Sequence, residues 1–393
     1  MRKYLFVWLL IGWTISTVNG QGTTGSVVGQ DSSNHVITTA VPFLGITPDS
    51  RAAGMGDAGV ATSADANSSY WNPGKLVFIE KGGLGFSTSY TPWLARIVND
   101  MKLLYLTGFY RIDRNQVVSG SLKYFDMGDI QLNHGPNPSQ QDGRYNPREF
   151  AFDVTYSRLL TEHFGLGGSV RYIRSNLTGA IPTNPDARAG NSVAVDIGAF
   201  YTKQFERHNS TLSLGGSITN FGSKMTYTSA SNKDFIPINL RLGGAYKTEL
   251  DHLNSLTFAL DFNKLMVPSN NTAQNTNHTI PLFTGALGSF TDASLSRELA
   301  EIKISTGMEY WYNNFFAARV GYFYETKDQG NRKYLTAGLG VRYEMANRDM
   351  FGLDMAYMIP TTLYNFALAE TIRFTLFYVL PVKTAKQNDT PND

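Results

Sequence analysis

The sequence contains no cysteine, so it forms no disulfides and offers no thiolate as a metal ligand or nucleophile. It also has no run of about 18 apolar residues, so we expect no membrane-spanning helix. Charged residues make up only 17% of the chain, below the roughly 25% of ordinary soluble proteins. The net charge is +2, so no bulk field would attract nucleic acid, and we expect no nucleic-acid partner.

Glycine and aromatic residues are abundant: there are 37 Gly, 21 Tyr and 24 Phe. Arg2 and Lys3 precede an apolar stretch over 4–15, and small residues follow at 18–20. This pattern predicts a secretory signal peptide over residues 1–20, and its apolar part is too short to span a bilayer. An exported chain without cysteine or spanning helices, rich in Gly and Tyr, fits an outer-membrane β-barrel.

Apolar and small or polar residues alternate through much of the chain, as in strands with two different faces. Phe150, Phe152, Val154 and Tyr156, for example, alternate with Ala151, Asp153, Thr155 and Ser157. Segments of about 9–12 residues exceed the usual soluble strand and match a tilted membrane strand. We predict fourteen strands, at 83–92, 102–111, 116–126, 148–159, 163–174, 192–203, 210–220, 237–247, 255–263, 301–311, 315–325, 333–343, 350–359 and 370–380.

The connections between these segments alternate in length. Tight, charged connections lie at 112–115, 160–163, 204–207, 248–251, 312–314 and 345–348, and longer segments lie between them. Short turns at one end and long loops at the other are typical of bacterial barrels. The predicted fold is therefore all-β: a 14-stranded antiparallel transmembrane β-barrel over residues 81–380. A soluble β-sandwich, whose strands also alternate, is the alternative.

Residues 54–59 read G-M-G-D-A-G, a formal G-x-G-x-x-G. A dinucleotide-binding loop needs a strand before this motif and a helix after it, and neither is predicted here. A barrel of fourteen strands has a wide lumen that must be filled or will conduct water. We interpret residues 21–80 as an N-terminal segment that forms a luminal plug, in which glycines permit tight turns. The polar tail, 381–393, is expected to be disordered.

The N-terminal stretch R-A-A-G-M-G-D-A-G-V-A at 51–61, followed by D-A-N-S at 65–68 and W-N-P at 71–73, resembles the FadL-like outer-membrane barrels. Within that superfamily the chain is similar to the PorV family of the type IX secretion system, through residues 40–73, 259–265 and 288–292. The residues that carry the candidate plug motif are Arg51, Gly54, Gly56, Asp57, Asp65, Trp71, Asn72 and Pro73.

The resemblance implies a bacterial outer-membrane protein with a role in protein transport. PorV-like proteins collect secreted cargo through its C-terminal domain at a SprA-type translocon barrel and shuttle it to a surface attachment complex with a PorU-like protease. Contact with membrane lipid and lipopolysaccharide is expected of any such barrel. The alternative function is that of a FadL-type transporter of hydrophobic small molecules such as fatty acids.

Catalytic chemistry has little support in the sequence. The six histidines lie in predicted loops or turns, and no H-x-x-x-H or similar metal pattern exists. We predict no enzymatic activity, no cofactor and no metal site. Charged residues of both signs fall on the predicted inward face, and we expect them to pair with each other and with the plug.

The longest loop, 264–300, is the best candidate for a binding surface, because barrels carry specificity in their loops. Residues 280–290 are unusually apolar for a surface loop, and 292–300 is predicted to form a short capped helix. One interpretation is that this segment folds over its own barrel mouth. The other is a docking surface for cargo or translocon, with Leu282, Phe283, Leu287 and Phe290 as its candidate residues.

Overall fold

The computed structural model describes residues 36–80, 82–95, 97–133, 141–177, 187–228, 233–269, 278–361 and 371–381. The predicted signal peptide (1–20), the start of the predicted plug (21–35) and residues 382–393 of the predicted tail lie outside the described residues.

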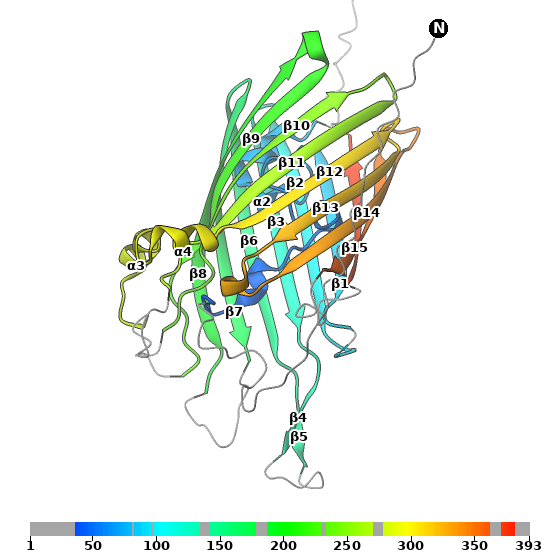
Figure 1. The fold of residues 1–393 in the computed structure, drawn as a ribbon. Coiled ribbons are helices and arrows are strands. Elements are labelled where there is room, and N and C mark those ends of the chain that lie inside the picture. The colour runs from blue at the N-terminus through cyan, green and yellow to red at the C-terminus, as the bar shows by residue number, and fades with distance from the viewer. Residues whose placement is uncertain are drawn as a thin grey trace, which may run out of the picture. The chain divides into compact units, whose positions relative to one another are not determined.

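Fourteen strands of the described residues close into one antiparallel barrel (Figure 1). The strand pairs run in order along the chain, and β16 closes the ring on β1 from Leu84–Leu380 to Tyr90–Phe374. The prediction of a 14-stranded barrel is confirmed. Its strands are β1 (Leu84–Pro92), β2 (Lys102–Asp113), β3 (Gln116–Asp126), β6 (Arg148–Thr161), β7 (Phe164–Asn176), β8 (Gly190–Phe205), β9 (Ser210–Gly222), β10 (Asn239–Glu249), β11 (Asn254–Leu265), β12 (Lys303–Tyr312), β13 (Phe316–Tyr324), β14 (Lys333–Glu344), β15 (Met350–Pro360) and β16 (Ile372–Leu380).

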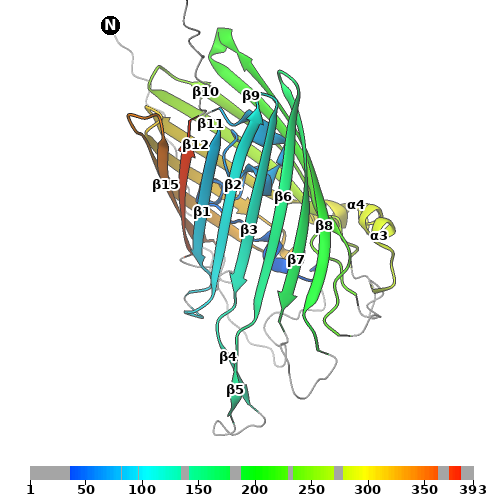
Figure 2. The ribbon, with the colours of Figure 1, turned by 180° about the vertical axis from the view of Figure 1, so that it is seen from behind.

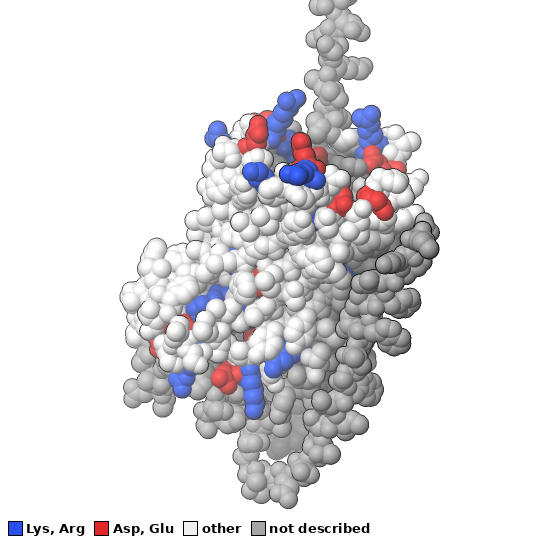
Figure 3. Space-filling view, turned by 45° about the horizontal axis from the view of Figure 1, so that its top comes forward, with Lys and Arg blue, Asp and Glu red and all other residues white. Residues whose placement is uncertain are grey.

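The apolar face of the strands points outward. In β7, Leu166, Val170 and Tyr172 are exposed, and the intervening Ser169 and Arg171 are buried. A soluble sandwich would bury the apolar face against a second sheet, so the alternative fold is wrong. In Figure 3, Lys, Arg, Asp and Glu gather at the end with the short connections, and the wall below shows mostly uncharged surface. This arrangement matches a lipid-facing wall between charged rims.

Residues 40–79, which we call the inner segment, lie between the strands on both sides of the ring, as the blue ribbon shows in Figures 1 and 2. They form four short helical turns: η1 (Pro42–Gly45), α1 (Ser50–Ala53), α2 (Ser68–Trp71) and η2 (Pro73–Phe78). One apolar cluster joins Val41 and Phe43 to Ile236 and Ile238, near the long connections. A second joins Leu76 to Phe109 and Val379, near the short connections.

The connections contain structure that the sequence pattern predicted only in part. β4 (Ile130–Asn133) and β5 (Gln141–Tyr145) form a hairpin that extends away from the barrel (Figure 1), in a connection for which we predicted no strand. Each of these strands is too short to show a clear alternation. Between β11 and β12 lie α3 (Leu282–Gly288) and α4 (Leu295–Ala300), and single 3-10 turns η3 (Glu206–His208) and η5 (Lys327–Gln329) occur elsewhere. None of the helices in the described part of the chain has the length and hydropathy needed to cross a membrane.

Candidate functional site

Two regions bring together the residues that the sequence marked for function. The first is the contact between the inner segment and the barrel wall. The second is the pair of helices in the longest loop.

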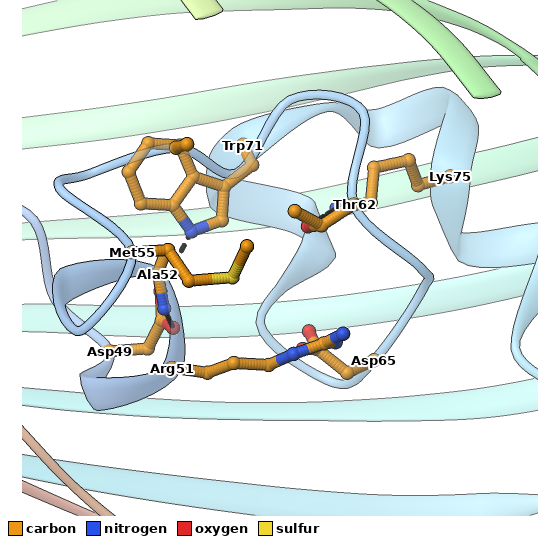
Figure 4. Close-up of a pocket in the computed structure, with 9 residues that line it drawn as sticks. Asp49, Arg51, Ala52, Met55, Thr62, Asp65, Trp71 and Lys75 are labelled. Atoms are coloured by element: carbon orange, nitrogen blue, oxygen red, sulfur yellow. Dashed lines mark hydrogen bonds and ion pairs between the residues drawn. The ribbon is translucent and has the colours of Figure 1, made fainter. Parts of the chain in front are cut away.

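Asp49 connects two of the four helical turns of the inner segment, α1 and α2. Its Oδ1 accepts a hydrogen bond from the Ala52 backbone N–H at 2.9 Å, which caps α1. Its Oδ2 accepts from Trp71 Nε1 at 2.7 Å, at the end of α2 (Figure 4). Burial raises the pKa of Asp49 to about 6, because the charged form loses its hydration.

Arg51 links the inner segment to the opposite wall of strands. Its Nε and one Nη donate to Glu309 of β12 at 2.9 and 2.8 Å, a bidentate pair. Its other Nη donates to Asp65 at 3.0 Å, within the inner segment. Glu309 also accepts from Arg319 Nε at 2.7 Å, and Arg319 reaches Asp354 at 2.6 Å. Cations and carboxylates alternate along this buried chain, so that each charge has a partner of opposite sign. The expected pairing of inward charges with the inner segment is observed.

The glycines of the G-x-G-x-x-G motif allow the inner segment to pack closely against its neighbours. Gly56 has φ +68°, and a Cβ on it would lie 2.5 Å from the Tyr322 backbone nitrogen. A Cβ on Gly59 would lie 2.3 Å from the ring of Trp71. The backbone N–H groups of Gly59 and Val60 donate to the Asp261 carboxylate of β11 at 2.7 and 2.8 Å. The anion at this loop is therefore a side chain of the barrel and not a phosphate.

Asn72 and Pro73 fix the inner segment against β7 and β8. The Asn72 side-chain oxygen accepts from the Gly74 backbone N–H at 3.0 Å and caps η2. The Asn72 amide group donates to the Ala199 carbonyl at 2.9 Å. Pro73 lies over Gly167 and Gly198, where a Cβ would lie 2.5–2.8 Å from its atoms.

Between these groups lies a cavity of about 10 Å³, room for roughly one water molecule. Figure 4 shows Arg51, Asp65, Thr62 and Lys75 around it, together with Met55 and Trp71. Lys75 Nζ donates to the Gly59 carbonyl at 2.6 Å, and burial lowers the pKa of Lys75 to about 8. A space of this size holds no substrate.

The second region is the loop between β11 and β12. Gly285 and Ala286 of α3 are buried, and Ala286 belongs to the same apolar cluster as Val41 and Phe43. Of the four residues predicted for a binding surface, Phe283 and Leu287 are both 66% exposed, and Phe290 is 39% exposed. Leu282 is half-buried and packs against that apolar cluster. The segment thus packs against this apolar cluster on one side and presents apolar side chains to solvent on the other.

Of the predicted helix over 292–300, only Leu295–Ala300 is helical, as α4, and it adds two residues to this face. Leu295 and Leu299 are 75% and 58% exposed. We did not predict them, although their i, i+4 spacing places both on one side of the helix. The apolar surface of the helix pair, which we call the loop face, therefore consists of Phe283, Leu287, Phe290, Leu295 and Leu299. Figures 1 and 2 show α3 and α4 at the side of the barrel.

Ion pairs hold α4 from beneath. Lys264 of β11 donates to Glu298 at 2.8 Å and also to Glu301. Glu298 accepts from the Ala293 backbone N–H at 3.0 Å, and Asp292 accepts from the Ser269 N–H at 2.8 Å. The start of α4 lacks a side-chain cap from Ser294, its N-cap residue. The three carboxylates lie within 4.8 Å of one another, in a geometry that could hold a cation, and the Lys264 ammonium already supplies positive charge there.

Comparison with known proteins gives the family. Residues 29–272 match the profile described as "Type IX secretion system protein PorV", which is more than half of the chain. The chain belongs to the PorV family. It is accordingly a bacterial outer-membrane protein of the type IX secretion system. No curated protein matches it.

Several solved barrels are similar to this PorV-family chain in outline. The Pseudomonas putida toluene transporter TodX has 11% sequence identity and a TM-score of 0.47, with 83% of this chain and 96% of TodX covered. A Pseudomonas aeruginosa FadL homologue has 10% identity and a TM-score of 0.45, over 88% and 99% of the two chains. The Ralstonia pickettii toluene transporter TbuX has 11% identity and a TM-score of 0.42, over 85% and 97%. Likeness at this level carries no inference about what the chain transports.

Proposed function

We propose that this PorV-family barrel binds secreted cargo through the cargo's C-terminal domain at a SprA-type translocon. It then shuttles the cargo to a surface attachment complex that includes a PorU-like protease. Membership of the PorV family supports a role in the type IX secretion system. The loop face is the observation that carries the binding role, because an exposed apolar patch with polar surroundings is typical of an interface.

The position of the loop face suits such a role. Bacterial barrels place their short turns in the periplasm and their long loops outside the cell. The loop face lies in the longest connection, and by that rule it faces the exterior. Its base is fixed by Lys264 and by the buried Ala286. A rigid base means that binding through the exposed side chains costs little additional ordering.

The interior supports the interpretation of the inner segment as a plug. Paired ions connect Arg51 to the barrel wall. Several inward aromatic side chains pack in separate small groups: Phe200 packs on Phe78, and Phe323 stacks on Tyr334. Trp311 lies beneath the guanidinium groups of Arg319 and Arg342. A FadL-type transporter of hydrophobic molecules would need a connected apolar path, so we favour the cargo role.

The test replaces the exposed side chains of the loop face. We expect Phe283→Asn, Leu287→Asn, Leu295→Asn and Leu299→Asn in combination to lower surface delivery of secreted proteins at least about tenfold, as loss of a central apolar contact does at interfaces. Leu282 is left unchanged, because it packs inside the apolar cluster. Delivery is measured by fractionating cells that carry the variant as their only copy.

The matched control is Leu250→Asn, which changes an equally exposed leucine (60%) at the end with short connections. Both variants must reach the outer membrane and keep the faster gel migration of an unheated, folded barrel. Normal delivery by a folded loop-face variant would contradict the proposed docking role.

A further inference from the structure

A second, larger cavity lies at the end of the lumen with the long connections. Its volume is about 90 Å³, enough for roughly six to nine waters at 10–15 Å³ each. Its wall comes from residues at the ends of β9 to β14, and its floor includes Thr47 and Trp71 of the inner segment. We call it the mouth cavity.

The mouth cavity carries an excess of positive charge. Arg241, Lys303 and Arg332 line it, against a single acid, Asp57. Lys303 and Arg332 share one carboxylate, Glu325, at 3.2 Å and at 2.6 and 2.8 Å. Asp57 itself accepts from the Tyr334 hydroxyl at 2.5 Å and lies 3.8 Å from the guanidinium of Arg373. With these partners counted, four cations face two carboxylates.

Arg241 is the most informative of the cations. It is only 6% exposed, and its guanidinium stacks on Tyr70 and Trp71 at 4.9 and 5.1 Å. One Nη donates to the Tyr70 carbonyl at 3.0 Å, and its Nε donates to Asn239 in the amide orientation that satisfies both groups. Among the described residues, no carboxylate forms an ion pair with it within 4.0 Å, and Asp196 and Asp261 act on it only from farther away. Buried charges are normally paired, so this guanidinium is ready for an anion.

Neutral donors complete the wall. Ser305 is fully buried and lines the cavity, and its Oγ has no hydrogen-bond partner among the described residues. Asn220 and Asn263 add amide groups. The side chains of Lys303 and Arg332 are 19% and 42% exposed, so the cavity is reachable from solvent. Hydroxyl, amide, guanidinium and ammonium groups around one space are the donor set that a carboxylate or phosphate requires.

We propose that the mouth cavity is a binding site for a small oxyanion, a carboxylate or phosphate group on a molecule of fewer than about ten heavy atoms. Arg241 and Lys303 supply the opposing charge, and Ser305 donates a hydrogen bond to the bound group. The site is separate from the loop face, and it does not depend on the proposed cargo role.

The test is calorimetric titration of the purified full chain in a nonionic detergent, at constant ionic strength with chloride as the balancing ion. Acetate and N-acetylglycine test binding of a carboxylate group, and inorganic phosphate tests binding of a phosphate group. Glycinamide is the cationic control. We expect saturable binding of at least one oxyanion and none of glycinamide. The series shows whether carboxylate or phosphate binds more tightly.

Variants separate this site from general charge effects. Lys303→Gln should weaken binding about tenfold, the effect of losing one charge-assisted hydrogen bond. It should leave the fold intact, because Glu325 keeps its contacts with Arg332. Ser305→Ala should weaken binding severalfold, and it removes no hydrogen bond of this side chain within the described residues. Lys247→Gln, an exposed lysine near the short connections, should have no effect.

Absence of saturable oxyanion binding at matched ionic strength would overturn the proposal, as would preferential binding of glycinamide. Equal affinities for the wild type, Lys303→Gln and Ser305→Ala would also overturn it, since binding would then lie elsewhere.

Discussion

At the scale of single residues, Gly56 shows how closely the inner segment approaches the barrel wall. Its positive φ suits glycine, and the space for a Cβ is taken by backbone atoms of Tyr322 and Thr306 at 2.5–2.7 Å. Backbone atoms in a closed sheet cannot move aside singly. Any side chain here must shift the inner segment away from β12 and β13.

We therefore expect Gly56→Ala to lower stability by roughly 3 kcal/mol, through overpacking and an unfavourable backbone conformation together. The matched control is Gly45→Ala, because a Cβ on Gly45 would meet nothing within 4 Å. The measurement is the temperature at which the folded gel band converts to the unfolded band. Equal temperatures for the two variants would show that the inner segment does not press on the wall at Gly56.

Asp49 makes stability depend on pH. Its pKa is about 6 in the folded chain, above the ordinary value of 3.8, so between these values the folded state binds more protons than the unfolded state. Its contribution is fully present below about pH 4 and is lost as the pH rises through about 6. We expect Asp49→Asn to flatten this part of the stability profile, relative to wild type and to the exposed control Asp328→Asn. The measurement is the temperature at which the folded gel band converts to the unfolded band, taken from pH 4 to 7. If this temperature depends on pH in Asp49→Asn as it does in the wild type, the assignment to Asp49 is contradicted.

The sequence predicted which residue types would meet inside the barrel, but not the individual pairs. Arg51 and Glu309 are 258 positions apart, and their contact depends on strand register and on the path of the inner segment. The motif at 54–59 is a further example. Local spacing excluded a dinucleotide loop, but only the fold reveals that Asp261 is the group its backbone N–H groups bind.

At the scale of elements, α4 depends on one lysine. Lys264 places an ammonium group between Glu298 and Glu301, with Asp292 nearby. Without it, three carboxylates within 4.8 Å would repel one another. The helix has only six residues and cannot persist without its contacts.

Lys264→Met should therefore release α4 from the barrel. We expect trypsin to cleave after Arg297, which is exposed on α4, at least about tenfold faster than in wild type, because local opening becomes cheaper. Lys247→Met, at the other end of the barrel, serves as the control. Cleavage at the wild-type rate would mean that apolar contacts alone hold the helix.

The strands could be predicted because each is long and alternates apolar with small or polar residues, so that every second side chain lies on the same face. All fourteen lie within two residues of their predicted ends, as for 116–126 and β3 (Gln116–Asp126). The hairpin β4–β5 and helix α3 were missed because both are short. The apolar run at 280–290 resembles a strand as much as a helix over so few residues.

At the scale of the whole molecule, the chain combines an apolar outer wall, an interior that contains buried ion pairs and an exposed apolar loop face. The first is required for residence in the outer membrane. The ion pairs inside the barrel support a filled lumen. The loop face supports docking of a partner outside the barrel. We propose from these three features that this PorV-family protein acts by carrying other proteins on its loops.

The most direct test is to solubilise the outer membrane gently, capture the tagged chain and identify what is bound to it. We predict that a very large barrel protein and secreted proteins sharing a C-terminal domain co-purify with the wild type and with Leu250→Asn. They should be lost from the variant with a polar loop face. If the wild type is recovered alone, or carrying only a small apolar ligand, the cargo role is contradicted and a transporter of hydrophobic molecules takes its place.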